Sequence, residues 1–136
     1  MLEQSDHGVL STLHPWRGVD AVPACFAVAG SRLAVPVDRV KPKDSTDLTR
    51  TRNLDADPRA VLLCDRWDRV DWSKLWWVRA WLERVTADPQ ERSSFEAQLR
   101  ERYPPYADED FAEVLVFRIT GLSGWAAAGS GRGVGQ

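Results

Sequence analysis

The chain has 136 residues, 43% of them apolar, a length and composition that suit one domain with a single sizeable core and argue against two domains. With 18 Lys and Arg residues against 20 Asp and Glu residues, the net charge is -2, which argues against nucleic-acid or anionic-membrane partners because both need a broad positive field. No apolar run reaches the roughly 20 residues of a membrane span, and the first six residues do not resemble a signal peptide, so we expect a cytoplasmic protein.

The first part of the chain predicts three strands joined by turns. An apolar stretch at 8–13 and an extended run at 19–28 read as a hairpin, and residues 32–38 read as a third strand. Pro36 lies inside this third strand and cannot donate a ladder hydrogen bond. We therefore expect Pro36 at a sheet edge or a bulge.

The remaining chain predicts two helices and three further strands. Asp44 or Ser45 can cap the first helix, and Asp88-Pro89 opens the second with Pro at its first position. The expected elements are a helix from 44 or 45 to about 55, a strand at 59–65, a strand at 75–85, a helix from 89 to about 102 and a strand at 113–120.

Tryptophan is concentrated around the strand at 75–85: the chain has seven Trp, five of them between residues 67 and 81. Because side chains alternate along a strand, Trp76 and Val78 fall on one face, and Trp77 and Trp81 fall on the other. Both faces are largely apolar, so we expect one to face the barrel interior and the other a partner, most simply a second copy in a two-fold homodimer. A platform for a flat ligand is the alternative use of these rings.

Six strands and two helices predict a mainly β protein, an antiparallel barrel or strongly coiled sheet. We place this single domain at residues 1–128. The Gly-rich segment 129–136 is expected to be a disordered tail.

The Lys41-Pro42-Lys43 triplet lies between the third strand and the first helix. Two ammonium groups and the free N–H groups of a helix start suit an anion or phosphate. An exposed basic turn is the alternative, and the carboxylate of Asp44 would compete with phosphate for the same donors.

The other polar residues give weaker signals. Arg50, Arg52 and Asn53 lie near the end of the first helix, where cations complement the helix dipole, so capping is one interpretation. No spacing typical of a metal site, a nucleotide-binding loop or a nucleophilic triad is present, so no metal is expected and the catalytic residues are unknown.

A set of motifs in fixed order resembles the pyridoxamine 5'-phosphate oxidase-like split barrels, and more narrowly their actinobacterial branch of deazaflavin-dependent (coenzyme F420) oxidoreductases. The resemblance covers about residues 8–126. Its motifs are VPACF at 22–26, GSRL at 30–33, VDRVKPK at 37–43, RNL at 52–54, DWSKLWWVR at 71–79 and LSGW at 122–125.

The resemblance implies a six-stranded antiparallel split β-barrel that forms a homodimer, with a flat deazaflavin or flavin in a groove at the interface. It assigns three sets of cofactor-binding residues. The phosphate set is Lys41, Lys43, Ser45 and Thr46, with Arg52 and Asn53 in support; Pro36, Val37 and Asp38 would run beside the ring; and Trp77, Arg79 and Trp125 would form a wall contributed across the interface.

The implied activity is hydride transfer between F420 and a small electron-poor substrate, chemistry that the cofactor supplies and that needs no particular catalytic side chain. Two alternatives stay open within the same fold: an FMN-binding oxidase or reductase, and a protein that binds flavin, deazaflavin or haem without catalysis. The family usually has a helix of ten or more residues before the first strand, where seven residues stand here, so the resemblance does not imply a substrate class.

Overall fold

The computed structural model describes residues 2–38 and 45–127. Within these ranges one antiparallel sheet of seven strands is accompanied by two α-helices and three short 3-10 helices. The strands are β1 (Gly8–His14), β2 (Gly18–Ala24), β3 (Ala27–Ala29), β4 (Arg32–Asp38), β5 (Arg59–Arg66), β6 (Trp76–Val85) and β7 (Phe111–Ala126). The helices are α1 (Ser45–Ala56), α2 (Pro89–Arg102), η1 (Leu2–Gln4), η2 (Trp72–Lys74) and η3 (Pro104–Tyr106).

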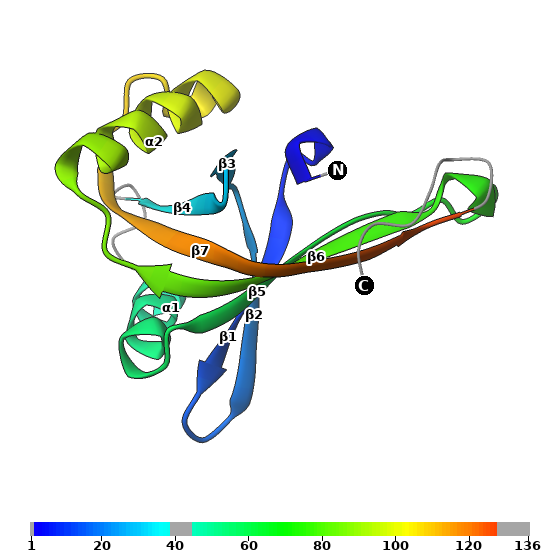
Figure 1. Cartoon of the computed structure of the whole chain (residues 1–136), viewed down its shortest axis with the longest axis horizontal. Helices are drawn as coiled ribbons and strands as arrows, with labels where there is room; N and C mark the ends of the chain where they lie inside the picture. The colour runs from blue at the N-terminus through cyan, green and yellow to red at the C-terminus, as the bar shows by residue number, and fades with distance from the viewer. Residues whose placement is uncertain (1, 39–44, 128–136) are drawn as a thin grey trace.

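The order of strands across the sheet is β2-β1-β5-β6-β7-β4-β3. Strands β2 and β3 therefore lie at opposite edges, yet only Cys25 and Phe26 separate them in the chain. The sheet must curl to bring these edges together, which produces a barrel-like body that stays open because β2 and β3 share no ladder (Figure 1).

The predicted barrel of six strands is corrected to seven strands in an unclosed sheet. The expected strand at 19–28 divides at Cys25 because its partner β1 begins at Gly8, which pairs with Ala24. Beyond that point the chain turns inward, and Phe26 is fully buried. The last strand is also longer than expected, since Phe111–Ala126 replaces 113–120.

Both predicted helices are confirmed. The Asp88 side chain accepts a hydrogen bond from the Glu91 backbone N–H at 2.7 Å, with Pro89 at the first helical position. Helix α2 buries Phe95 and Leu99 against the second of two cores, over β3, β4 and the start of β7 (Figure 1). None of the helices in the described ranges is long and apolar enough to cross a membrane.

The main core fills the inside of the curl. It is made by the inward faces of the strands, including Leu10, Leu33, Leu62, Val78 and Phe117. Pro36 is placed as expected: β3 pairs with β4 only over Arg32–Ala34, and the register with β7 shifts between Val37 and Asp38. The missing N–H of Pro36 thus leaves no gap in a ladder.

Strands β5, β6 and β7 continue beyond the body as a long ribbon, which reaches away from α1 and α2 in Figure 1. The loop and η2 at the tip carry Trp67 and Trp72, whose ring centroids are 6.3 Å apart and which are both exposed. The body and the ribbon together set where the candidate site residues lie.

Candidate functional site

The predicted cofactor-binding residues form two groups in the structure. The first group lies where β4 ends and α1 begins. Lys41 and Lys43 are outside the described residues, and of Asp38, Ser45 and Thr46 only the backbone is described, at the end of β4 and the start of α1. The predicted phosphate set therefore stays a prediction.

Pro36 and Val37 are both buried in β4, and the Val37 side chain packs in the main core. In the register of the sheet, Pro36 lies opposite Val114 and Val37 opposite Glu113 of β7. A ring beside this segment would not meet the Val37 side chain, because that side chain faces the main core.

Asn53 has a defined structural role. It is 2% exposed, and its amide nitrogen donates to Thr12 Oγ1 at 3.0 Å and to Asp20 Oδ2 at 2.9 Å. Hydrogen bonds from Arg17 and Asn53 hold the pKa of Asp20 below its ordinary value of 3.8. Asn53 thus links α1 to the β1–β2 hairpin.

The interpretation of Arg50 and Arg52 as caps for the end of α1 is wrong. The helix continues to Ala56, and its last turn holds no basic residue. Arg50 is instead buried, at 5% exposure, while Arg52 is exposed.

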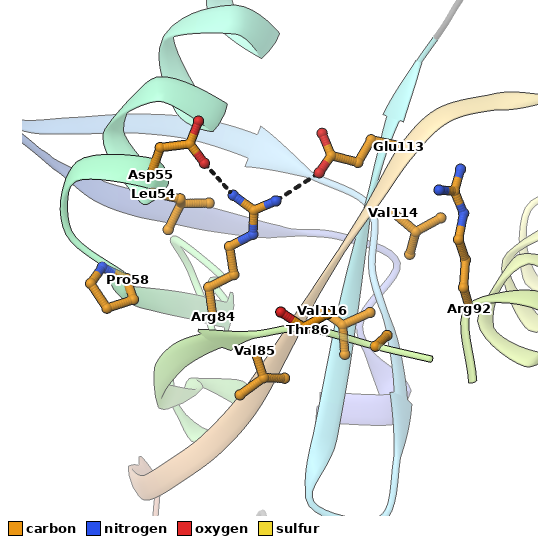
Figure 2. Close-up of a pocket in the computed structure, with 11 residues that line it drawn as sticks. Leu54, Asp55, Pro58, Arg84, Val85, Thr86, Arg92, Glu113, Val114 and Val116 are labelled. Carbon is orange, nitrogen blue, oxygen red and sulfur yellow. Dashed lines mark hydrogen bonds and ion pairs between the residues drawn. The ribbon is translucent and has the colours of Figure 1, made fainter. Parts of the chain in front are cut away.

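A polar hollow of about 500 Å³ opens between the end of α1, the end of β6, the start of β7 and α2 (Figure 2). Arg84 lies at its centre and donates to Asp55 Oδ1 at 2.9 Å and to Glu113 Oε2 at 2.7 Å. Arg92 also lines the hollow and pairs with Glu96. Because each guanidinium has a carboxylate, the described residues alone give this hollow no surplus of positive charge.

The second group, Trp77, Arg79 and Trp125, lies on the outer face of the ribbon. Trp77 of β6 is directly opposite Trp125 of β7, and Arg79 is opposite Ser123. The Arg79 guanidinium lies 5.2 Å from the Trp77 ring centroid and 4.4 Å from that of Trp81, and its Nε donates to Ser123 Oγ at 3.2 Å. Two rings and a hydroxyl therefore hold the cation in one place.

A mainly apolar hollow of about 360 Å³ adjoins this group. Its lining includes Arg66, Arg79 and four Trp rings, which are Trp67, Trp76, Trp77 and Trp125. Aromatic walls with a small number of charged groups are typical of sites for flat ligands, and the volume lies within the usual range for small-molecule sites. Two guanidiniums against the one carboxylate of Asp65 leave the lining with a positive charge, so the residues present fit a planar ring system with an anionic substituent.

The two groups are far apart within one chain. Trp77 lies near the distal end of β6, whereas Val85 ends β6 opposite Val116 of β7, two residues from the Val114 that pairs with Pro36. Eight residues at about 3.3 Å each separate Trp77 from Val85 by about 26 Å along the strand. Among the residues that the structure describes, a single copy does not bring Trp77 close to the end of β4.

Trp81 was not among the predicted cofactor-binding residues, although it lies on the second apolar face of the strand predicted at 75–85. Trp81 is 39% exposed on the outer face and lies opposite Val61 of β5 and Gly121 of β7. A further hollow of about 550 Å³ lies beside Trp81 and Val61. The apolar residues on both faces of the strand at 75–85 already indicated in the sequence that this outer surface is covered by something.

No family model and no curated protein matches the sequence. Solved structures do match. A haem-binding protein of Mycobacterium smegmatis gives a TM-score of 0.72 at 15% identity over 98% of this chain and 54% of that chain. An FMN-binding protein of Syntrophomonas wolfei gives 0.63 at 18% identity, over 86% of this chain and 75% of that chain. An F420 reductase gives 0.56 at 19% identity, over 86% and 88% of the two chains.

The chain shares the fold of these proteins. The predicted mainly β architecture, a strongly coiled antiparallel sheet with two helices, is thereby confirmed, with the strand count corrected as above. At these sequence identities the likeness shows the fold alone. The names of the three proteins mention three different cofactors, haem, FMN and F420.

Proposed function

We propose that the protein is an F420-dependent oxidoreductase that acts in the cytoplasm as a homodimer, with the cofactor between the two copies. The observation that carries the proposal is the apolar hollow with its Trp walls and fixed guanidinium, in a fold shared with an F420 reductase. The motif resemblance adds the phosphate set Lys41, Lys43, Ser45 and Thr46.

A bound deazaflavin would supply a ring carbon that donates or accepts a hydride. The residues of this chain hold and orient flat molecules: Trp77 and Trp125 provide aromatic surfaces, and Arg79 provides a cation for a negatively charged part of the ring system. The Trp rings also keep water from the reacting faces. We assign no proton-transferring side chain.

The homodimer follows from the separation of the two residue groups. We place two parts in the site, the phosphate segment after β4 and the wall formed by Trp77, Arg79 and Trp125. The end of β4 lies near the Val85 end of β6, whereas Trp77 lies near the other end. In the proposed dimer one copy provides the segment 36–53, and the partner provides the wall.

Two other functions are consistent with the shared fold. An FMN-binding oxidase or reductase is favoured by the likeness to an FMN-binding protein, and a binding protein without catalysis is favoured by the likeness to a haem-binding protein. Oxygen consumption during turnover would distinguish an FMN oxidase from an F420-dependent enzyme. FMN has a ring nitrogen where F420 has the reacting carbon, and this nitrogen allows reaction with oxygen.

The test is a fluorescence and absorbance titration of the purified protein with F420, FMN and haem in parallel. We expect saturable binding of F420 at one molecule per subunit, tighter than that of FMN or haem. Preference for FMN or haem would replace the proposal with the corresponding alternative, and binding of none would overturn all three.

The phosphate set is tested in the same titration. Lys41→Glu and Lys43→Glu should each weaken F420 binding by about tenfold or more, because each replaces a favourable charge contact with a repulsive one. Arg69→Glu is the matched control, since Arg69 is exposed in the loop after β5 and is not assigned to the site. If Lys41→Glu and Lys43→Glu bind F420 as tightly as Arg69→Glu does, the assignment of the phosphate set is contradicted.

A further inference from the structure

Arg84, near the end of β6, is bound by two carboxylates that come from different elements. Its guanidinium donates to Asp55 Oδ1 of α1 at 2.9 Å and to Glu113 Oε2 of β7 at 2.7 Å. Figure 2 shows the guanidinium between the two carboxylates. The Arg84 side chain is only 23% exposed, so salt screens its contacts less than it screens an ion pair on the open surface.

The backbone of Arg84 adds a third contact in the same region. Its N–H donates to the carbonyl oxygen of Pro58 at 2.8 Å, and Pro58 lies in the connection between α1 and β5. A guanidinium is suited to a central position because its planar set of donors can serve two carboxylates in a fixed geometry. One residue of β6 therefore contacts the end of α1, the residues that follow α1, and β7.

Three consecutive residues hold the end of α1 on different sides. Asn53 bonds to the β1–β2 hairpin, Leu54 packs in the main core, and Asp55 is bound to β6. Since an α-helix has 3.6 residues per turn, Asn53 and Asp55 point in directions that differ by about 200°. Contacts on nearly opposite sides fix the direction of the helix axis as well as the position of its end.

The other carboxylate lies beside the end of β4. Glu113 is directly opposite Val37 in the ladder between β7 and β4. Arg84 therefore fixes two elements relative to each other, since Asp55 belongs to α1 and Glu113 belongs to the strand that pairs with the end of β4. The predicted phosphate residues Ser45 and Thr46 are the first two residues of α1.

Helix α1 transmits a change at its end to its start. Ser45 and Asp55 are ten residues apart, which is about 15 Å along the helix axis. A rotation of about 4° about the Asp55 end therefore displaces the Ser45 end by about 1 Å. A displacement of this size is enough to spoil the fit between fixed hydrogen-bond donors and an anion.

We propose that Arg84 is a positioning residue for the phosphate of the cofactor. Both terminal nitrogens of its guanidinium already serve carboxylates, so Arg84 acts through α1 and the end of β4 and not by touching the phosphate. Without the guanidinium, Asp55 and Glu113 repel each other, and this repulsion turns α1 away from β7. The inference rests on the proposed function and adds the residue that sets the geometry of its phosphate half.

The experiment compares the affinities of the wild type, Arg84→Gln and Arg92→Gln for F420 and for the same deazaflavin ring without its phosphate, both followed by fluorescence. Arg84→Gln should bind F420 about fivefold or more weakly and should bind the phosphate-free ring within about twofold of the wild type. A purely structural defect would lower both affinities together. Arg92→Gln is the matched control, since Arg92 lines the same hollow but pairs with Glu96 inside α2, and it should change neither affinity.

A second variant covers the case in which Arg84→Gln folds poorly. The Asp55 side chain is 66% exposed, so Asp55→Asn leaves the core intact while it removes the charge that α1 offers to Arg84. Asp55→Asn should show the same selective loss of F420 affinity, by about twofold. The double variant should bind F420 no more weakly than Arg84→Gln alone, because the two side chains act in one interaction.

Each other result overturns the inference. An equal loss for both ligands in Arg84→Gln, or an equal loss of F420 affinity in Arg92→Gln, would show that Arg84 has no selective effect on the phosphate. Equal affinity of the wild type for the two ligands would show that no phosphate contact exists to be positioned. If the wild type binds F420 and the variants bind it equally well, the proposed function stands and only the positioning role fails. A wild type that binds neither ligand would overturn both.

Discussion

At the scale of the residue, Asn53 shows how a polar side chain positions a helix. Both amide hydrogens are used, one by Thr12 and one by Asp20, and the group is almost fully buried. A buried polar group that loses its partner pays the cost of desolvation without a compensating hydrogen bond. Asn53 therefore anchors α1 on the β1–β2 hairpin, beside Leu54, which packs in the main core.

Asn53→Ala should lower the free energy of unfolding by about 1–3 kcal/mol, because Thr12 and Asp20 lose a buried donor. Urea denaturation at a fixed protein concentration measures the change. Arg52→Ala is the control, since Arg52 is the exposed neighbour on the same helix, and it should change stability by no more than about 0.5 kcal/mol. Equal losses in both variants would show that the hydrogen bonds are not responsible.

At the scale of the element, the close approach of β1 to β5 depends on a glycine. A Cβ atom at Gly8 would lie 2.9 Å from the carbonyl oxygen of Leu63 and 2.9 Å from Cys64 Sγ. The carbonyl is part of the sheet backbone and cannot move without disturbing the ladder. The start of β1 is therefore restricted to glycine by packing and not by its backbone dihedral angles.

Gly8→Ala should destabilise the protein by about 1–3 kcal/mol, because β1 must move away from β5. Thermal unfolding of Gly8→Ala and of a control variant, compared with the wild type, measures the effect. Gly121→Ala is the matched control, since its Cβ would meet only the Trp81 ring at 3.4 Å, and it should stay within about 1 kcal/mol of the wild type. A tolerated Gly8→Ala would mean that β1 and β5 can separate freely.

At the scale of the whole molecule, the proposed site is divided between two copies, and subunit mixing tests this directly. Lys41→Glu damages the phosphate half and Trp125→Asp damages the wall, so each variant alone should bind F420 at least about tenfold more weakly than the wild type. Mixing equal amounts by joint refolding should restore about one quarter of the wild-type sites, because half of the dimers are mixed and each mixed dimer has one intact site.

Mixing Lys41→Glu with Lys43→Glu provides the control. Both substitutions damage the same half, so every site in the mixed dimer keeps a defect and no binding should return. Recovery in neither mixture would indicate a site contained within one copy. Recovery in the control would show that the phosphate set is wrong.

The local elements were accessible from the sequence because their signals are local. Asp88-Pro89 predicted the start of α2, the alternation along 75–85 predicted β6 and its two apolar faces, and Pro36 predicted the irregular edge of β4. The end of α1 was also predicted to within one residue, but the capping interpretation of Arg50 and Arg52 failed because both residues precede the last turn and Arg50 is buried by tertiary packing.

The sequence by itself determined the periodic elements, the fold class and the presence of a second apolar face on β6, since these follow from the spacing of apolar and turn-forming residues. Only the tertiary structure decided that 19–28 is two strands at opposite sheet edges, and that Arg84 joins the end of α1 to β7. It also decided that Trp77 and the end of β4 are too distant to meet in one copy. Those facts depend on curl, register and distance between strands, which arise only when segments far apart in the chain pack together.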